Sequence, residues 1–124
     1  MSHFSKILTC ISNLEILKKT INDLGFKYKV DKYNLRKNKL DIYDFSIEDK
    51  LLFSFEFDQD KYVLIADLQL WSLNIDFNSF LEKLNQYYSY NIVLNQSQVK
   101  GFNKTFEKVM DDGSIKLVME KWSD

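Results

Sequence analysis

Two neighbouring runs of alternating apolar residues constrain the fold of this chain more than any other feature. Leu51–Phe57 and Tyr62–Leu70 both have the pattern of a β-strand, and the four residues between them suit a turn. A hairpin built on that turn places Phe55 opposite Leu64. We therefore expect the centre of the core to consist of Leu51, Phe53, Phe55, Leu64, Ala66 and Leu68.

Two helices are predicted from their end signals. Ser12 followed by Glu15 forms a capping box that satisfies the first free N–H groups of a helix, and Gly25 supplies the left-handed residue that closes it. Asp76 is a good cap for a second helix, which ends at Gly101. Apolar residues recur at helical spacing in both segments, so each helix has one face for a core.

Further strands are expected at Ser2–Ile11, Phe26–Val30 and Leu40–Ile47. A last hairpin is predicted from Phe102 to Trp122, with a type I′ turn at Asp112-Gly113. Both predicted helices end in Gly-Phe and lead into strands, which suggests an internal pseudo-repeat. The fold class predicted for the single domain 1–124 is α+β, with a mainly antiparallel sheet of about six or seven strands and two helices packed on one face.

The charge balance argues against partners that are recognised by charge alone. The chain has 124 residues, with 17 basic and 18 acidic side chains, so the formal net charge is −1. Such a balance gives no general electrostatic attraction to nucleic acid or to an anionic membrane. No apolar run approaches the ~20 residues needed to span a bilayer, so no membrane span is expected.

Catalytic and metal-binding residue sets are missing from the sequence. His3 and Cys10 are the single histidine and cysteine, so one chain cannot build a His/Cys metal set. Cys10 is instead expected to be a small buried apolar residue. No pair of carboxylates and no glycine-rich phosphate loop is recognisable. We therefore expect no catalytic residues, no metal, no cofactor and no enzyme activity.

A candidate binding surface follows from the end of the central hairpin. Asp67, Gln69 and Trp71 alternate along the predicted strand, on the face opposite to the core. A carboxylate, an amide and an indole together suit the recognition of a protein partner. Either this face is open, or another element covers it and Asp67 is paired inside. The sequence leaves both readings open, but it favours a non-enzymatic binding or assembly factor with a protein partner.

The alternative function is nucleic-acid binding by a basic loop at residues 29–39. Tyr28 lies directly before this loop and Tyr33 lies within it, and aromatic and basic side chains together are typical of single-strand nucleic-acid sites. The predicted contacts are Lys29, Lys32, Arg36, Lys37 and Lys39. Asp31 interrupts this run, and exposed loops of a lysine-rich protein are commonly basic.

Several short segments, taken in order and spacing, resemble a known family. They are Met-Ser-His-Phe-Ser at the start, Asp23-Leu24-Gly25-Phe26, Ala66-Asp67-Leu68-Gln69 with Trp71, Tyr88-Ser89-Tyr90, Lys100-Gly101-Phe102, Asp112-Gly113-Ser114-Ile115 and Lys121-Trp122-Ser123. The chain resembles, over essentially its whole length, the uncharacterised cyanobacterial and red-lineage plastid family called hypothetical chloroplast reading frame thirty-five. The resemblance implies a location in the chloroplast stroma, or in the cytoplasm of a bacterium. It implies no reaction, cofactor or catalytic residue.

Overall fold

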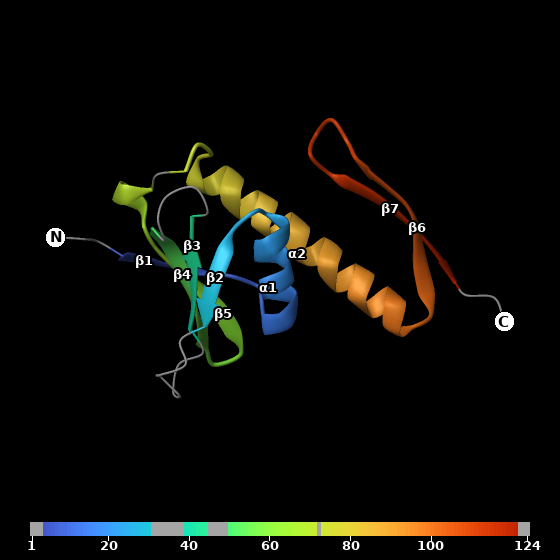
Figure 1. Ribbon diagram of the computed structural model, residues 1–124, viewed down its shortest axis with the longest axis horizontal. Coiled ribbons are helices and arrows are strands. Elements are labelled where there is room, and N and C mark those ends of the chain that lie inside the picture. Colours follow the sequence, from blue (N-terminus) through green and yellow to red (C-terminus); the bar gives the residue numbers. More distant parts are fainter. Residues whose placement is uncertain (1–3, 31–38, 45–49, 72, 122–124) are drawn as a thin grey trace.

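A five-stranded antiparallel sheet with two helices on one face forms the body of the protein (Figure 1). The structure is a computed structural model that describes residues 4–30, 39–44, 50–71 and 73–121. The strand order is β1-β5-β4-β3-β2. The strands are β1 (Phe4–Leu8), β2 (Lys27–Val30), β3 (Lys39–Tyr43), β4 (Leu51–Asp58) and β5 (Lys61–Asp67). The predicted α+β class is confirmed.

The β4–β5 hairpin is the centre of this sheet, and its predicted register is confirmed. Phe55 pairs with Leu64, and the pairing continues to Asp58 and Lys61. The turn therefore has two central residues and not four, and Gln59 takes the positive φ of 63° that this tight connection requires. Phe53, Phe55, Leu64 and Ala66 are all buried, as expected.

Leu51 and Leu68 were wrongly expected at the centre of the core, because both are exposed. Tyr43 pairs with Leu51 while Ile42 pairs with Phe53, so Leu52 is an extra residue in β4. Such a bulge reverses the alternation, which turns Leu51 to the other face of the sheet. Leu68 lies beyond the end of β5, in a short 3₁₀ helix, η1 (Leu68–Leu70).

The first helix, α1 (Leu14–Asp23), begins one residue later than the predicted capping box. Its cap is Asn13, whose side chain accepts a hydrogen bond from the Ile16 N–H at 3.1 Å. Asn is as good a cap as Ser, so this shift of one residue costs little. The Ser12 and Asn13 N–H groups both donate to the Tyr88 hydroxyl, which fixes the start of α1 against the second helix.

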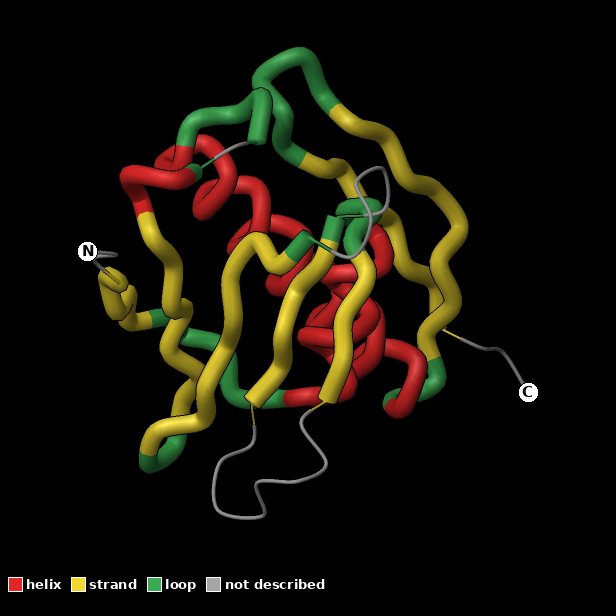
Figure 2. The backbone as a smooth tube through the Cα atoms, turned by 60° about the vertical axis from the view of Figure 1, so that its left-hand side comes forward, coloured by secondary structure: helices red, strands yellow, loops and turns green. Residues whose placement is uncertain are grey.

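The second helix, α2 (Phe77–Val99), has the predicted cap and end. The Asp76 side chain accepts from the Ser79 N–H, and Gly101 follows with a φ of 87°. Both helices lie on the same side of the sheet (Figure 2). The core is packed between them and the sheet, where Leu17, Ile21 and Leu84 are fully buried.

The last two strands do not join the main sheet, which corrects the expected sheet of six or seven strands. β6 (Phe102–Val109) and β7 (Ile115–Lys121) pair only with each other. They lie on the side of α2 that is turned away from the main sheet (Figure 1). With 23 residues, α2 is about 35 Å long, so it carries the chain past the sheet before β6 begins. The two halves of the chain therefore share only the order of a helix, a glycine and a pair of antiparallel strands, and they do not form one continuous sheet.

The turn between β6 and β7 also differs from the predicted type I′. The Gly113 N–H donates to the Met110 carbonyl, and Met110 in turn donates to the Ser114 carbonyl. Of the turn residues, Gly113 alone has a positive φ. This is a type I turn followed by a left-handed glycine, so the loop has three residues. The Gln86 amide of α2 donates to the Gly113 carbonyl, which holds the hairpin tip against the helix.

A salt bridge on β6 gives a pH-dependent prediction. The Lys104 ammonium lies 2.8 Å from a Glu107 carboxylate oxygen, and this hydrogen bond is the main cause of a lowered pKa of Glu107. A lowered pKa in the folded state stabilises the fold above the ordinary pKa of glutamate, and this contribution is lost as the pH falls through the lowered value. In Lys104→Gln we expect the pKa of Glu107 to rise toward its ordinary value. A carbon-13 NMR titration of the carboxyl group measures this, and an unchanged midpoint would contradict the assignment.

Candidate functional site

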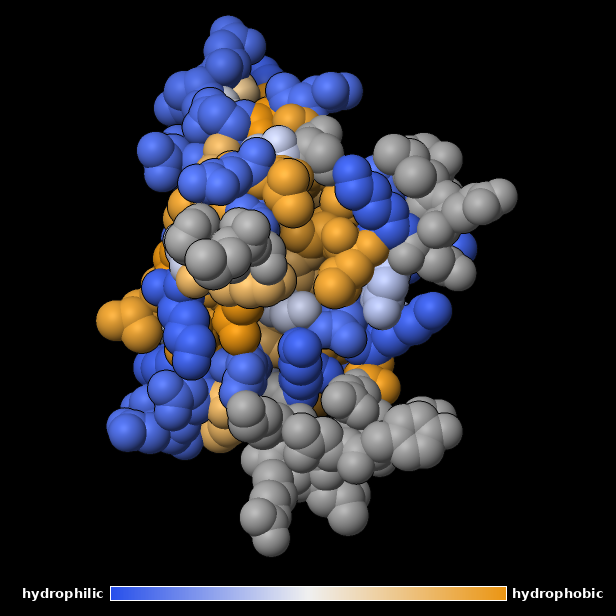
Figure 3. Space-filling model, turned by 90° about the vertical axis from the view of Figure 1, so that its left-hand side faces the viewer, coloured by the Kyte–Doolittle hydropathy of each residue, from blue (hydrophilic) through white to orange (hydrophobic). Residues whose placement is uncertain are grey.

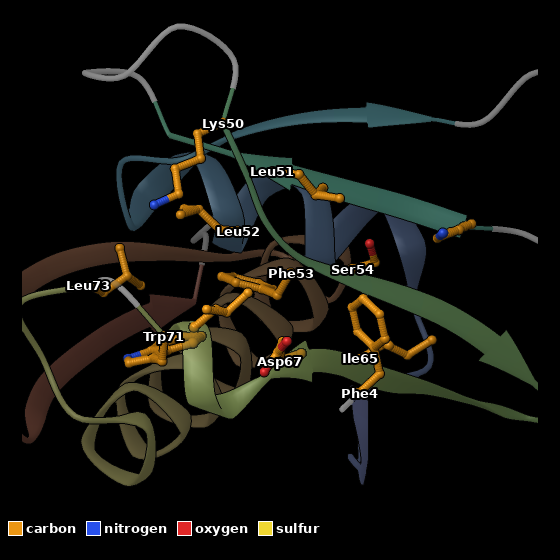
Figure 4. Close-up of a pocket in the computed structure, with 13 residues that line it drawn as sticks. Phe4, Lys50, Leu51, Leu52, Phe53, Ser54, Ile65, Asp67, Trp71 and Leu73 are labelled. Atoms are coloured by element: carbon orange, nitrogen blue, oxygen red, sulfur yellow. The ribbon is translucent and has the colours of Figure 1, made fainter. Parts of the chain in front are cut away.

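The candidate site is a groove at one end of the main sheet, with a cavity volume of about 510 Å³ (Figure 4). Its apolar lining consists of Phe4, Leu51, Leu52, Phe53, Ile65, Ala66, Leu70, Trp71 and Leu73. Its polar lining consists of Lys39, Lys50, Ser54 and Asp67. Trp71, Phe53 and Leu73 stand at one end of the cavity, and Phe4 and Ile65 stand at the other.

The groove opens on the outer face of the sheet, which we define as the face turned away from α1 and α2. Phe53, which packs on Phe80 of α2, lines the groove from the inner face. Figure 3 looks onto this face and shows a hydrophobic patch framed by hydrophilic side chains. Among the described elements, neither helix covers it (Figure 2). At the rim, Phe4 is 65% exposed and Leu70 is 72% exposed. Of the two readings that the sequence left open, the described residues therefore fit the open face.

Asp67 lines the groove, as a residue at the end of β5 that also begins η1. Its carboxylate accepts a hydrogen bond from the Gln69 N–H at 3.1 Å, so it caps the 3₁₀ turn. Gln69 itself is exposed and is not part of the groove lining. The strand ends where Asp67 offers this cap, so the predicted alternation of Asp67, Gln69 and Trp71 along one strand is wrong.

Trp71 is a wall of the groove and also part of the packing beneath it. After the η1 turn its ring stacks on Phe53 at 5.8 Å between centroids, and it meets Phe77 edge-on at 5.1 Å. Its indole N–H donates to the Ile75 carbonyl at 2.8 Å. The structure thus brings Trp71 and Asp67 to the same cavity, although by a turn and not by strand alternation.

Two polar residues of the groove lining, Ser54 and Lys39, are held in place by the neighbouring Asp41. The Ser54 hydroxyl donates to the Asp41 carboxylate at 2.7 Å, and the Lys39 ammonium lies 3.8 Å from the same carboxylate. Ser54 is buried and Asp41 is partly buried. These three residues come from paired strands, so they form a short polar ladder beside the apolar lining. The groove can therefore take an apolar side chain, and Asp67, Lys39 and Lys50 are the charged residues of its lining.

The basic residues predicted for nucleic-acid binding are only partly described. Lys29 lies over the ring of Tyr43 at 4.7 Å, and Lys39 belongs to the polar ladder. The other three predicted contacts, Lys32, Arg36 and Lys37, lie outside the described residues. Nucleic-acid binding by this loop stays a prediction.

The single cysteine is exposed, so the expectation of a buried Cys10 is wrong. The alternation of β1 continues past its end at Leu8, and it places Cys10 on the same exposed side as Leu8. His3 lies outside the described residues. Within the part of the chain that the structure describes, no three His, Cys, Asp or Glu side chains are grouped to hold a metal ion. No helix in that part is long and apolar enough to cross a membrane.

Phe4, Leu51, Leu70 and Leu73 are among the groove residues that sequence reasoning missed. Leu51 was assigned to the core, and Leu70 falls on the core side of the same alternation, because the bulge at Leu52 and the η1 turn leave no mark in the apolar pattern. One signal did exist, since Asp is unfavourable within a strand and favourable as a cap. Asp67 could therefore have predicted the end of β5.

The fold and the site define a small α+β domain with an open apolar groove on the helix-free face of its sheet. A family model described as "Protein of unknown function (DUF1257)" matches residues 20–118, and the chain belongs to this family. It is 35% identical to "Uncharacterized protein ycf35" of Pyropia yezoensis, over 99% of both chains. It is 37% identical to the proteins of the same name from Cyanophora paradoxa and Guillardia theta, over 98% of each chain. These matches confirm the resemblance, and no solved structure matches the chain.

Proposed function

We propose that this protein is a non-enzymatic binding or assembly factor that holds a segment of a partner protein in the groove. The observation that carries the proposal is the open apolar lining at the end of the sheet, with Trp71 and Phe53 at one end and Phe4 at the other. Contiguous exposed apolar surface framed by polar residues is typical of an interaction site.

The extent of the exposed surface favours a protein partner over a small molecule. Beyond the cavity, the outer face continues along β1 from Phe4 through the exposed Lys6 to Leu8, which is 86% exposed. Five strand residues span roughly 13–17 Å, so this strip and the cavity together exceed what a small ligand covers. A partner segment can place an apolar side chain between Trp71 and Phe4 while the rest of it lies along the strip.

The charged rim suits the orientation of such a segment. Asp67 can accept a hydrogen bond or a cation from the partner, and Lys39 and Lys50 belong to the same lining. Polar groups around an apolar anchor fix direction and register, while the anchor supplies most of the affinity.

The test is a pull-down from an extract of the organism that encodes the protein, in the presence of nuclease. Leu70→Asp places a charge on the groove rim at a side chain that is 72% exposed in the free protein, so the fold should be unaffected. If a partner buries this position, the variant should lose about 1.4 kcal/mol or more of binding free energy, which is roughly tenfold in affinity and lowers the recovery of the partner.

The matched control is Val99→Asp, which makes the same kind of change at an 81% exposed residue at the far end of α2. We expect it to recover the same partner as the unchanged protein. Equal recovery by both variants would overturn the groove as the binding site. Recovery that disappears with nuclease would favour the basic loop and nucleic acid instead.

We also propose that the protein works in the chloroplast stroma, which is the location that the family resemblance implies. An assembly factor there would meet its partner inside the organelle. A fluorescent fusion or an organelle fractionation tests this location independently of the groove.

A further inference from the structure

β1 is an open edge of the main sheet. In the strand order β1 and β2 are the two outermost strands, and β1 pairs along its whole length with β5 alone. Its other backbone edge therefore has no strand partner within the described part of the chain. An unpaired row of N–H and C=O groups can bind a further strand.

The side chains of β1 differ from those that protect an edge. On the outer face Phe4 is 65% exposed and Leu8 is 86% exposed, with Lys6 between them. At the opposite edge, β2 carries the two exposed lysines Lys27 and Lys29, which discourage pairing with another chain. Of the two edges, β1 is thus the apolar one.

Lys6 is the feature that selects the partner. Its ammonium takes part in no ion pair with another described residue. Full-length antiparallel pairing of β1 with a second copy of itself would place Lys6 directly opposite Lys6, which is destabilising. A strand with a carboxylate at that position would instead form an opposite-charge pair and keep its apolar neighbours beside Phe4 and Leu8.

We propose that β1 binds a strand of the partner protein, and that this strand carries a Glu or Asp between two apolar residues on its outer face. This inference rests on the proposed function and names the chemistry of the partner. Phe4 belongs both to β1 and to the groove lining, so a strand added at this edge continues directly into the groove.

The test uses a synthetic probe, the capped peptide Thr-Val-Thr-Glu-Thr-Leu-Thr, titrated to millimolar concentration against the full chain labelled with nitrogen-15. We expect chemical-shift changes at the amides of β1. In a strand, alternate N–H groups point to opposite edges. Two N-methylated peptides are therefore compared, one methylated at Val, Glu and Leu and the other at the Thr residues. We expect one of them to lose binding and the other to keep it. This difference distinguishes strand addition from simple apolar contact.

Charge reversal supplies the second readout. The Lys6→Glu variant should bind the glutamate peptide roughly tenfold more weakly than the unchanged protein does. The same variant should bind a peptide that has Lys in place of Glu. Lys83→Glu makes the same change at an exposed lysine of α2 and should have no effect. Absence of shifts in β1, equal effects of both N-methylation patterns, or indifference to the charge at Lys6 would each overturn the proposal.

Sedimentation of the protein alone tests whether a second copy of the chain, and not a partner strand, binds at the edge of β1. A dimer that is strengthened by Lys6→Thr, which removes the clash of like charges, would mean that β1 pairs with a second copy, which also overturns the proposal. These results are separate from the pull-down. If Leu70→Asp abolishes recovery of the partner while the peptide leaves β1 unperturbed, the groove proposal stands and only the strand addition fails.

Discussion

Phe53→Ala is expected to lower the free energy of unfolding by about 4 kcal/mol, the largest effect of any substitution proposed for this protein. Phe53 is 2% exposed, and its ring contacts those of Phe26, Phe80 and Trp71. Removing it leaves a cavity between the sheet and α2, and it also takes away the surface on which Trp71 stacks. Urea denaturation measures the loss.

The control for this substitution is Leu51→Ala on the same strand. Leu51 has the pattern of a core residue in the sequence but is exposed in the structure. We expect its loss to change the free energy of unfolding by less than about 1 kcal/mol. If the two variants were equally destabilised, the bulge at Leu52 and the resulting orientation of β4 would be wrong.

Asn91→Ala is expected to cost about 2 kcal/mol, because this side chain joins the two helices in a buried position. Its amide nitrogen donates to the Thr20 hydroxyl at 3.1 Å and to the Asp23 carboxylate at 3.0 Å. Its amide oxygen accepts from the Lys19 ammonium at 2.9 Å. Asn91 is fully enclosed, so water cannot replace these bonds without disturbing the packing.

Asn95→Ala is the matched control, one helical turn further along α2 at an exposed position. Alanine is a better helix former than asparagine, so this variant should be neutral or slightly stabilised. Comparison of the two denaturation midpoints isolates the buried network from helix propensity. Equal midpoints would contradict the role of Asn91 in joining α1 to α2.

Local signals in the sequence predicted those parts of the fold that local chemistry determines. The cap at Asp76 and the left-handed glycines at Gly25 and Gly101 gave the helix ends. The pairing of Phe55 with Leu64 followed from the alternation and from the position of the turn. In each case the residues that make the interaction lie close together in the chain.

The parts that were missed depend on contacts between distant residues. The separate β6–β7 hairpin depends on where a long α2 delivers the chain. The exposure of Leu51 depends on how β4 pairs with β3. Trp71 was assigned to a binding surface for its residue type, and the structure places it in the groove but also against Phe53 and Phe77. Trp71→Ala would therefore disturb packing and binding together, which is why Leu70 is the better position for a binding test.

Site-specific photo-cross-linking tests the central claim most directly. The protein would carry benzoylphenylalanine in place of Leu70 at the groove rim, or in place of Val99 at the end of α2, in nuclease-treated extract. The account predicts one defined protein adduct from position 70, suppressed by an excess of unlabelled protein, and no such adduct from position 99. No protein adduct at position 70, or the same adducts at both positions, would contradict it.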